Sequence, residues 1–100
     1  MLIVLAKAKV TAEALDAARP AIAAMVAASN AEEGCIAYAF TQDLGDPSIV
    51  HIVEKWRDEA ALTAHFATPH MATFGAAIAG LDFSVMEAVK FPTDDGAPVM

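Results

Sequence analysis

The segment Ile49–Phe74, IVHIVEKWRDEAALTAHFATPHMATF, brings an acid, an indole and two imidazoles into one short stretch. Glu54 precedes Trp56, the only tryptophan, by two residues, and His65 follows in the next predicted helix. Residues two apart on a strand share a face, so Glu54 and Trp56 would lie together. A carboxylate buried among apolar residues must be hydrogen-bonded or protonated, and either state shifts its pKa. Beside an imidazole, such a group is typical of proton-transfer chemistry.

Strand parity places Glu54 and Trp56 on one face and predicts Tyr38 opposite Glu54 and Ile36 opposite Trp56. His65 lies on the apolar side of the following helix, which would lower the imidazole onto Glu54 and Trp56. We therefore predict a pocket with Glu54, Trp56 and His65 as catalytic residues and His65 as proton acceptor or orienting group. The predicted lining residues are mostly large and apolar: Tyr38, Phe40, Ile52, Phe66, Met71, Phe74 and Met86.

The same polar groups could instead tie the helix to the sheet, because buried polar groups are usually hydrogen-bonded and structural. A metal site is not predicted, since His65 and His70 are five residues apart across Pro69, a spacing that places them on different faces. Glycine-rich phosphate loops and dinucleotide fingerprints are absent, so no cofactor is expected. The lone Cys35 starts a predicted strand, where a small buried side chain is expected rather than a nucleophile.

Hydrophobic periodicity predicts strands at residues 2–10, 35–42, 49–56 and 83–91. It also predicts a helix at 12–29 and two helical pieces on either side of Thr68-Pro69. Pro20 falls inside the first helix and predicts a kink or a break near Arg19. The order βαββαβ indicates an α+β, ferredoxin-like fold with a four-stranded antiparallel sheet and helices on one face. We expect one domain over residues 1–91 and a flexible or partner-contacting tail over 92–100.

The composition suggests how the other face of the sheet is used. Hydrophobic residues make up 57% of the 100 residues, against about 45–50% in ordinary globular proteins. Such a surplus favours a homodimer in which two sheets pack face to face into an α+β barrel, although abundant alanine could inflate the count. The net charge of −7 without a basic stripe argues against nucleic acid. No stretch is typical of a membrane span or signal peptide, so a cytoplasmic protein is expected.

The segments AEEGCIAYAF and VHIVEKWRDEAALTAHFATPHM resemble the antibiotic biosynthesis monooxygenase family. Glu54, Trp56, Asp58, His65 and the TPHM at residues 68–71 stand where the family pattern places them, and the likeness extends to about Phe91. The resemblance implies a homodimer without bound metal or flavin that oxidises quinols or other electron-rich aromatic rings directly with O₂. It also implies that Trp56 and His65 are pocket residues.

Two departures from the family pattern argue against particular activities within the family. Polyketide-oxidising relatives carry an asparagine four residues before the tryptophan, where this chain has Ile52, and haem-degrading relatives carry one on the first strand, which here has none. We therefore predict a cofactor-independent monooxygenase that acts on a quinol or hydroxylated aromatic. The alternatives are an isomerase or lyase that uses Glu54 and His65 on a small metabolite, and a non-catalytic ligand-binding or assembly dimer.

Overall fold

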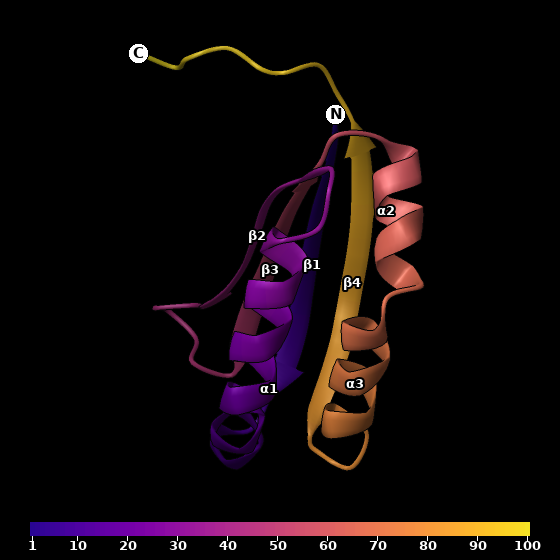
Figure 1. Cartoon of the computed structure of the whole chain (residues 1–100). Helices are drawn as coiled ribbons and strands as arrows, with labels where there is room; N and C mark the ends of the chain where they lie inside the picture. Colours follow the sequence, from indigo (N-terminus) through magenta and orange to yellow (C-terminus); the bar gives the residue numbers. More distant parts are fainter.

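The computed structural model describes residues 1–100, which form a four-stranded antiparallel sheet with helices on one face (Figure 1). The elements are β1 (Leu2–Val10), α1 (Ala12–Asn30), β2 (Cys35–Gln42), β3 (Ile49–Trp56), α2 (Glu59–Phe66), α3 (Pro69–Ile78) and β4 (Phe83–Pro92). The strand order is β2-β3-β1-β4, so β1 and β3 form the centre of the sheet. This is the ferredoxin-like α+β fold predicted from the sequence.

Each helix begins at a polar side chain that accepts a hydrogen bond from an amide three residues later. Thr11, Asp58 and Thr68 are these N-cap residues, for α1, α2 and α3. Such caps satisfy amides that have no partner within the helix and typically contribute about 1 kcal/mol each. Because α2 ends at Phe66 and α3 starts again at Pro69, the two helices do not share one helical phase. Residues on either side of this joint therefore cannot be assigned to faces by counting along a single helix.

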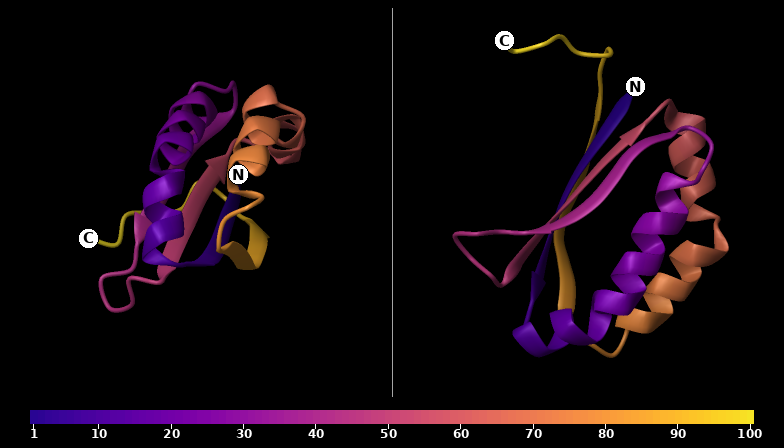
Figure 2. Two further views of the ribbon diagram at one scale, coloured as in Figure 1. Left: turned by 90° about the horizontal axis from the view of Figure 1, so that it is seen from below. Right: turned by 60° about the vertical axis from the view of Figure 1, so that its left-hand side comes forward.

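Pro20 does not break α1, which continues from Ala12 to Asn30. Of the predicted kink or break, the break is therefore wrong, while Figure 2 shows the axis of α1 changing direction between its first turns and the rest of the helix. Proline removes one backbone hydrogen bond and crowds the preceding turn. A bend relieves that crowding while the later turns keep their packing on the sheet.

The core lies between the sheet and the helices. Alternate residues of β1 are buried on the helix-covered face, namely Leu2, Val4, Ala6, Ala8 and Val10. From β3, Val50, Ile52, Glu54 and Trp56 are buried on the same face. Figure 2 shows that no helix covers the opposite face of the sheet.

A bulge in β2 changes one predicted pairing. The register shifts between Cys35 and Ala37, so Cys35 pairs with Trp56 while Tyr38 pairs with Glu54 as predicted. The prediction that Ile36 faces Trp56 is wrong, because the extra residue moves Ile36 out of the ladder and leaves it 56% exposed. A bulge adds one residue to one strand only, and strand parity alone does not reveal it.

An apolar row crosses the uncovered face of the sheet. Leu5 in β1 pairs with Val53 on one side and Val89 on the other, and Val53 pairs with Ala39. Leu5 and Val89 are each 46% exposed. The row therefore spans all four strands and remains largely open to solvent in the single chain.

Beyond β4 the chain has no regular secondary structure, and Figure 1 shows the last residues extending away from the sheet. Thr93 still exchanges two hydrogen bonds with Met1, at 2.9 and 3.0 Å. None of the helices combines the length and hydropathy needed to cross a membrane.

Candidate active site

The indole of Trp56 and the imidazole of His65 lie against each other beneath α2. Their ring centroids are 4.7 Å apart, and the Tyr38 ring lies 5.4 Å from the imidazole. Trp56 is 0% exposed and His65 is 2% exposed. The end of β3, the middle of β2 and the last turn of α2 thus bring three aromatic side chains together in a dry environment.

Glu54 is the second polar group on this face and is 9% exposed. Its Oε1 accepts a hydrogen bond of 2.9 Å from Nε1 of Trp56. The sequence places Tyr38 and His65 beside Glu54, but the hydrogen-bond partner in the structure is the neighbouring indole on the same strand. Burial raises the pKa of Glu54, and the Trp56 hydrogen bond and the nearby His65 only partly offset this increase.

Replacing Glu54 with glutamine is expected to remove a pH-dependent loss of stability. Because burial raises the pKa of Glu54 in the folded state, the folded protein holds a proton that the unfolded chain has released, and the free energy of unfolding falls as pH rises through this window. Glu54→Gln cannot ionise, yet its amide oxygen can still accept from Trp56. Urea unfolding of both proteins from acidic to neutral pH should show the variant gaining relative stability as pH rises, then a constant difference. Parallel curves would contradict the assignment of this carboxylate.

A further carboxylate, Glu32, orients the imidazole of His65. Oε2 of Glu32 accepts from Nδ1 of His65 at 2.6 Å and from Nε2 of His70 at 2.8 Å. The Glu32 side chain is 12% exposed and that of His70 is 22% exposed, so the group reaches from the core to the surface. One carboxylate oxygen therefore joins the turn after α1 to both α2 and α3.

Gly34 explains why Glu32 reaches α2. Its φ of +85° is a conformation that favours glycine, and a Cβ atom there would lie 2.7 Å from Cβ of Ala61. The turn therefore packs directly against α2 at Ala61. Because Ala61 and His65 are four residues apart, they lie on the same face of the helix, and Glu32 arrives beside the imidazole.

Sequence reasoning missed the roles of Glu32 and His70. The prediction that His65 and His70 point to different faces assumed regular helical spacing, whereas the joint at Ala67 and Thr68 resets the phase, and both side chains converge on Glu32. The sequence signal for Glu32 was its place immediately before a glycine turn and an aromatic-containing strand. That signal marks a turn but does not show which way the side chain points.

Two other ionisable side chains border the site. Burial is the largest cause raising the pKa of Tyr38, and the carboxylates of Glu54 and Glu32 raise it further. Its phenol therefore stays protonated at neutral pH and can donate a hydrogen bond but not act as a base. The pKa of Cys35 is likewise raised by burial and by the same carboxylates, which disfavours the reactive thiolate.

The structure divides the predicted lining residues into two groups. Phe40, Met71 and Phe74 pack against the core, with the Phe40 and Phe74 rings 5.7 Å apart, and Ile52 is buried opposite Phe40. Phe66, by contrast, is 64% exposed, although its ring lies 5.7 Å from that of His65.

Met86 is 58% exposed and sits at the register shift of β4. Two strands, β3 and β1, lie between β4 and β2. Met86 is therefore separated from Tyr38 by the width of the central sheet, and the structure does not bring it to the imidazole.

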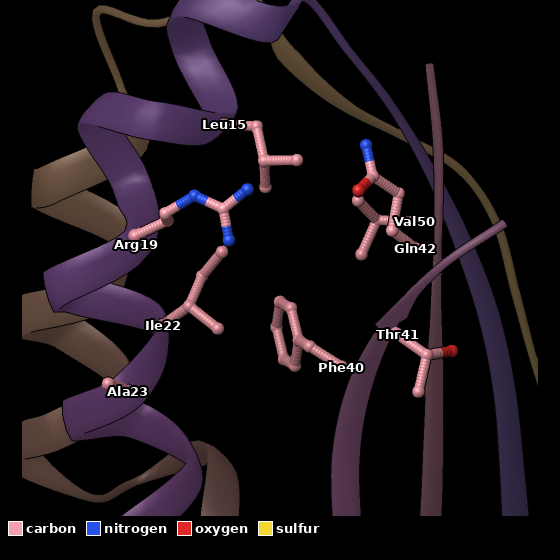
Figure 3. Close-up of a pocket in the computed structure, with 8 residues that line it drawn as sticks. All are labelled: Leu15, Arg19, Ile22, Ala23, Phe40, Thr41, Gln42 and Val50. Atoms are coloured by element: carbon pink, nitrogen blue, oxygen red, sulfur yellow. The ribbon is translucent and has the colours of Figure 1, made fainter. Parts of the chain in front are cut away.

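Two pockets flank the buried cluster without reaching Trp56 or His65. The first, of about 220 Å³, lies between α1 and the β2–β3 strands, with Phe40 in its wall and the Arg19 side chain above it (Figure 3). The second, of about 260 Å³, lies between α2 and β4 and has Phe66 in its wall. The Phe40 ring is 5.9 Å from Tyr38, so Phe40 and Tyr38 link the first pocket to the imidazole.

The arrangement can hold the imidazole of His65 in a defined orientation and tautomer. Glu32 engages Nδ1 of His65, which leaves the other ring nitrogen, Nε2, as an acceptor without a hydrogen-bond partner within the chain. A carboxylate that fixes the histidine tautomer also stabilises the imidazolium that forms when Nε2 takes a proton. The pair is thus suited to act as a general base in a desolvated aromatic site.

These features define a ferredoxin-like α+β protein with a buried Glu–His pair beside an indole. The profile of the family described as "Antibiotic biosynthesis monooxygenase" matches residues 1–77, and the chain belongs to this family.

Two individual relatives match parts of the chain. The chain is 38% identical over 52 residues to "Putative monooxygenase YcnE" of Bacillus subtilis, a match that covers 52% of this chain and 55% of the relative. It is 41% identical over 46 residues to "Uncharacterized protein sll1783" of Synechocystis, covering 46% of this chain and 31% of the relative. The matches thus span about half or less of these relatives' lengths.

Among solved structures, one of a Deinococcus radiodurans protein is similar over the whole chain. Its TM-score is 0.90 at 23% identity, with 100% of this chain and 99% of that chain covered. At this level of identity the likeness concerns the fold.

Proposed function

We propose that the chain is a monooxygenase that oxidises a small quinol or hydroxylated aromatic with O₂ and without a resident cofactor. The observation that carries this proposal is the 2.6 Å bond between Glu32 and His65, which prepares an imidazole base against the indole of Trp56. Membership in the monooxygenase family supports the reaction class.

The residues suit a reaction in which the substrate supplies the electrons. A hydroquinone and O₂ together contain the atoms of a hydroxylated quinone and one water, so no external reductant is required. Nε2 of His65 would accept the phenolic proton, because a phenolate gives up an electron to O₂ far more readily than a phenol. The Trp56 and Tyr38 rings would exclude water and hold the aromatic substrate in position.

Trp56 is fully buried and His65 is only 2% exposed, so a substrate of the size of a quinol would reach the imidazole only if a side chain moved. We assign the entrance to the pocket lined by Phe40, because the Phe40 ring lies 5.9 Å from that of Tyr38, which in turn lies 5.4 Å from the imidazole. Arg19 and Gln42 lie on opposite sides of the same pocket (Figure 3) and offer hydrogen-bond donors to the oxygens of a quinol.

The test is oxygen consumption with a panel of reduced benzoquinones and naphthoquinones, measured with and without protein. The expected result is uptake faster than uncatalysed autoxidation, one O₂ per quinol, and a hydroxylated product that is not formed anaerobically. No acceleration with any quinol, or the same product without oxygen, would contradict the proposal.

A second candidate is a non-catalytic ligand-binding or assembly subunit in which the cluster ties helices to sheet. It is favoured by the burial of Trp56 and His65. It is also favoured because every fully buried side-chain polar atom has a hydrogen-bond partner. A shift in the fluorescence of Trp56 on adding an aromatic ligand, without oxygen uptake, would favour this reading.

We further propose a homodimer in which the apolar rows of two sheets face each other. Replacing Leu5 with glutamate would place a charge between Val53 and Val89 and is expected to yield a monomer, because a desolvated charge without a partner opposes association. Light scattering should give twice the chain mass for the parent and the single mass for Leu5→Glu. Leu44→Glu, in the exposed β2–β3 turn, is the matched control and should remain dimeric. A monomeric parent would overturn the proposal.

A further inference from the structure

Glu32, His65 and His70 come from three different segments and present three metal-ligating atoms to one point. Nδ1 of His65, Nε2 of His70 and a carboxylate oxygen of Glu32 all lie within 4.8 Å of one another. The bond between Glu32 and His65 joins residues 33 apart in sequence, and that between Glu32 and His70 joins residues 38 apart. The fold itself, rather than a local motif, assembles this set.

The donor set matches the preferences of transition-metal ions. Two imidazole nitrogens and one carboxylate oxygen suit Zn²⁺ and similar ions, whereas Mg²⁺ and Ca²⁺ prefer oxygen ligands alone. Three protein ligands would also leave one position of a tetrahedral ion open. His70 is 22% exposed, so an ion can reach the set from solvent while His65 lies inside the core.

The distances require only a small adjustment. Two ligands about 2.0–2.1 Å from a tetrahedral ion lie about 3.3 Å apart, and the carboxylate–imidazole separations here are 2.6 and 2.8 Å. An ion could therefore replace the two bridging protons if the carboxylate–imidazole separations grew by about 0.5–0.7 Å and the two imidazole nitrogens, which lie within 4.8 Å of each other, took up the same spacing.

We propose that Glu32, His65 and His70 bind one divalent transition-metal ion, and that this binding switches off His65 as a base. A neutral imidazole that coordinates a metal through Nδ1 carries its proton on Nε2. The nitrogen that would accept the substrate's proton is then already protonated. The proposed loss of His65 as a base rests on the proposed function, whereas the metal-binding site itself does not.

Binding is tested by titrating metal-free protein, purified without a histidine tag, with ZnCl₂ by calorimetry and with CoCl₂ by visible absorption. We expect one ion per chain and the d–d absorption of low-symmetry, nitrogen-coordinated Co²⁺. Glu32→Gln and His70→Ala should each weaken Zn²⁺ binding by at least about ten-fold. His51→Ala is the matched control, because the third histidine pairs with Asp43 elsewhere and its loss should leave the affinity unchanged.

Three results would overturn the site: no Zn²⁺ or Co²⁺ binding, equal affinity in the parent and His70→Ala, or loss of binding in His51→Ala. Circular dichroism of every variant guards against misfolding, and His70→Gln replaces His70→Ala if the latter does not fold.

Oxygen uptake tests the switch separately. Zn²⁺ is expected to inhibit turnover in proportion to site occupancy, and a chelator should restore it. Binding without inhibition would overturn the switch but not the site. A protein without any quinol turnover would instead refute the proposed function, and calorimetry would still decide the metal site.

Discussion

Replacing His65 with alanine is expected to lower the rate of quinol oxidation by about 10²–10⁴-fold, the usual contribution of a positioned general base. The variant keeps the Trp56 indole and the Glu32–His70 bond, so the loss would report the missing imidazole itself. The measurement is oxygen uptake per folded molecule, with the folded fraction taken from circular dichroism. His51→Ala, which removes an imidazole outside the cluster, should retain the parent rate.

Chemical rescue with free imidazole distinguishes a catalytic base from a side chain that only stabilises the fold. The alanine variant leaves a cavity beside Trp56 and Glu32, and free imidazole that enters it should restore part of the activity with a pH dependence set by imidazole. If His65→Ala melts at a lower temperature but turns over at the parent rate per folded molecule, the imidazole only ties α2 to the sheet.

Replacing Trp56 with alanine is expected to cost about 3–5 kcal/mol of folding stability, the range found when large buried aromatic side chains are removed. Trp56 is completely buried, and its loss would also leave the Glu54 carboxylate without its hydrogen bond. Total stabilities of small domains are about 5–15 kcal/mol, so this one change could remove much of the margin. Urea unfolding followed by far-ultraviolet circular dichroism measures the effect, since the only tryptophan is lost.

The variant Trp56→Phe separates the loss of aromatic packing from the loss of the hydrogen bond to Glu54. Phenylalanine keeps an aromatic ring beside His65 but lacks the N–H that Glu54 accepts, so a smaller loss of about 1–3 kcal/mol is expected. Combining it with Glu54→Gln should recover part of the loss, because the neutral amide is less costly to bury than a carboxylate. Additive effects in the double variant would contradict a direct coupling of the two side chains. All proteins should be compared at one concentration, since association would add to apparent stability.

The order of elements followed from local signals. The helix that begins at residue 12 and the interruption at Thr68-Pro69 were readable, because capping and proline geometry act within a few residues. The burial of Glu54 and Trp56 followed from strand parity. By contrast, the continuity of α1 through Pro20 depends on tertiary packing, and the position of Ile36 depends on a bulge.

The carboxylate partner of His65 could not be predicted for a related reason. Glu32 acts across 33 residues of chain, and its direction is set by the backbone of a turn and by the contact of that turn with α2. Similarly, His70 joins the cluster because the joint between two helices changes its direction. Local periodicity carries no information about either of these long-range relationships.

The tight contact at Gly34 links two positions that otherwise look unrelated. A methyl group at residue 34 would collide with Ala61, and any larger residue at 61 would press on the same turn. Shrinking Ala61 would relieve the collision but not the positive φ, so any side chain at residue 34 is expected to disturb the turn that carries Glu32. The direction of the Glu32 carboxylate is therefore constrained by a steric contact between two residues that contain no reactive group.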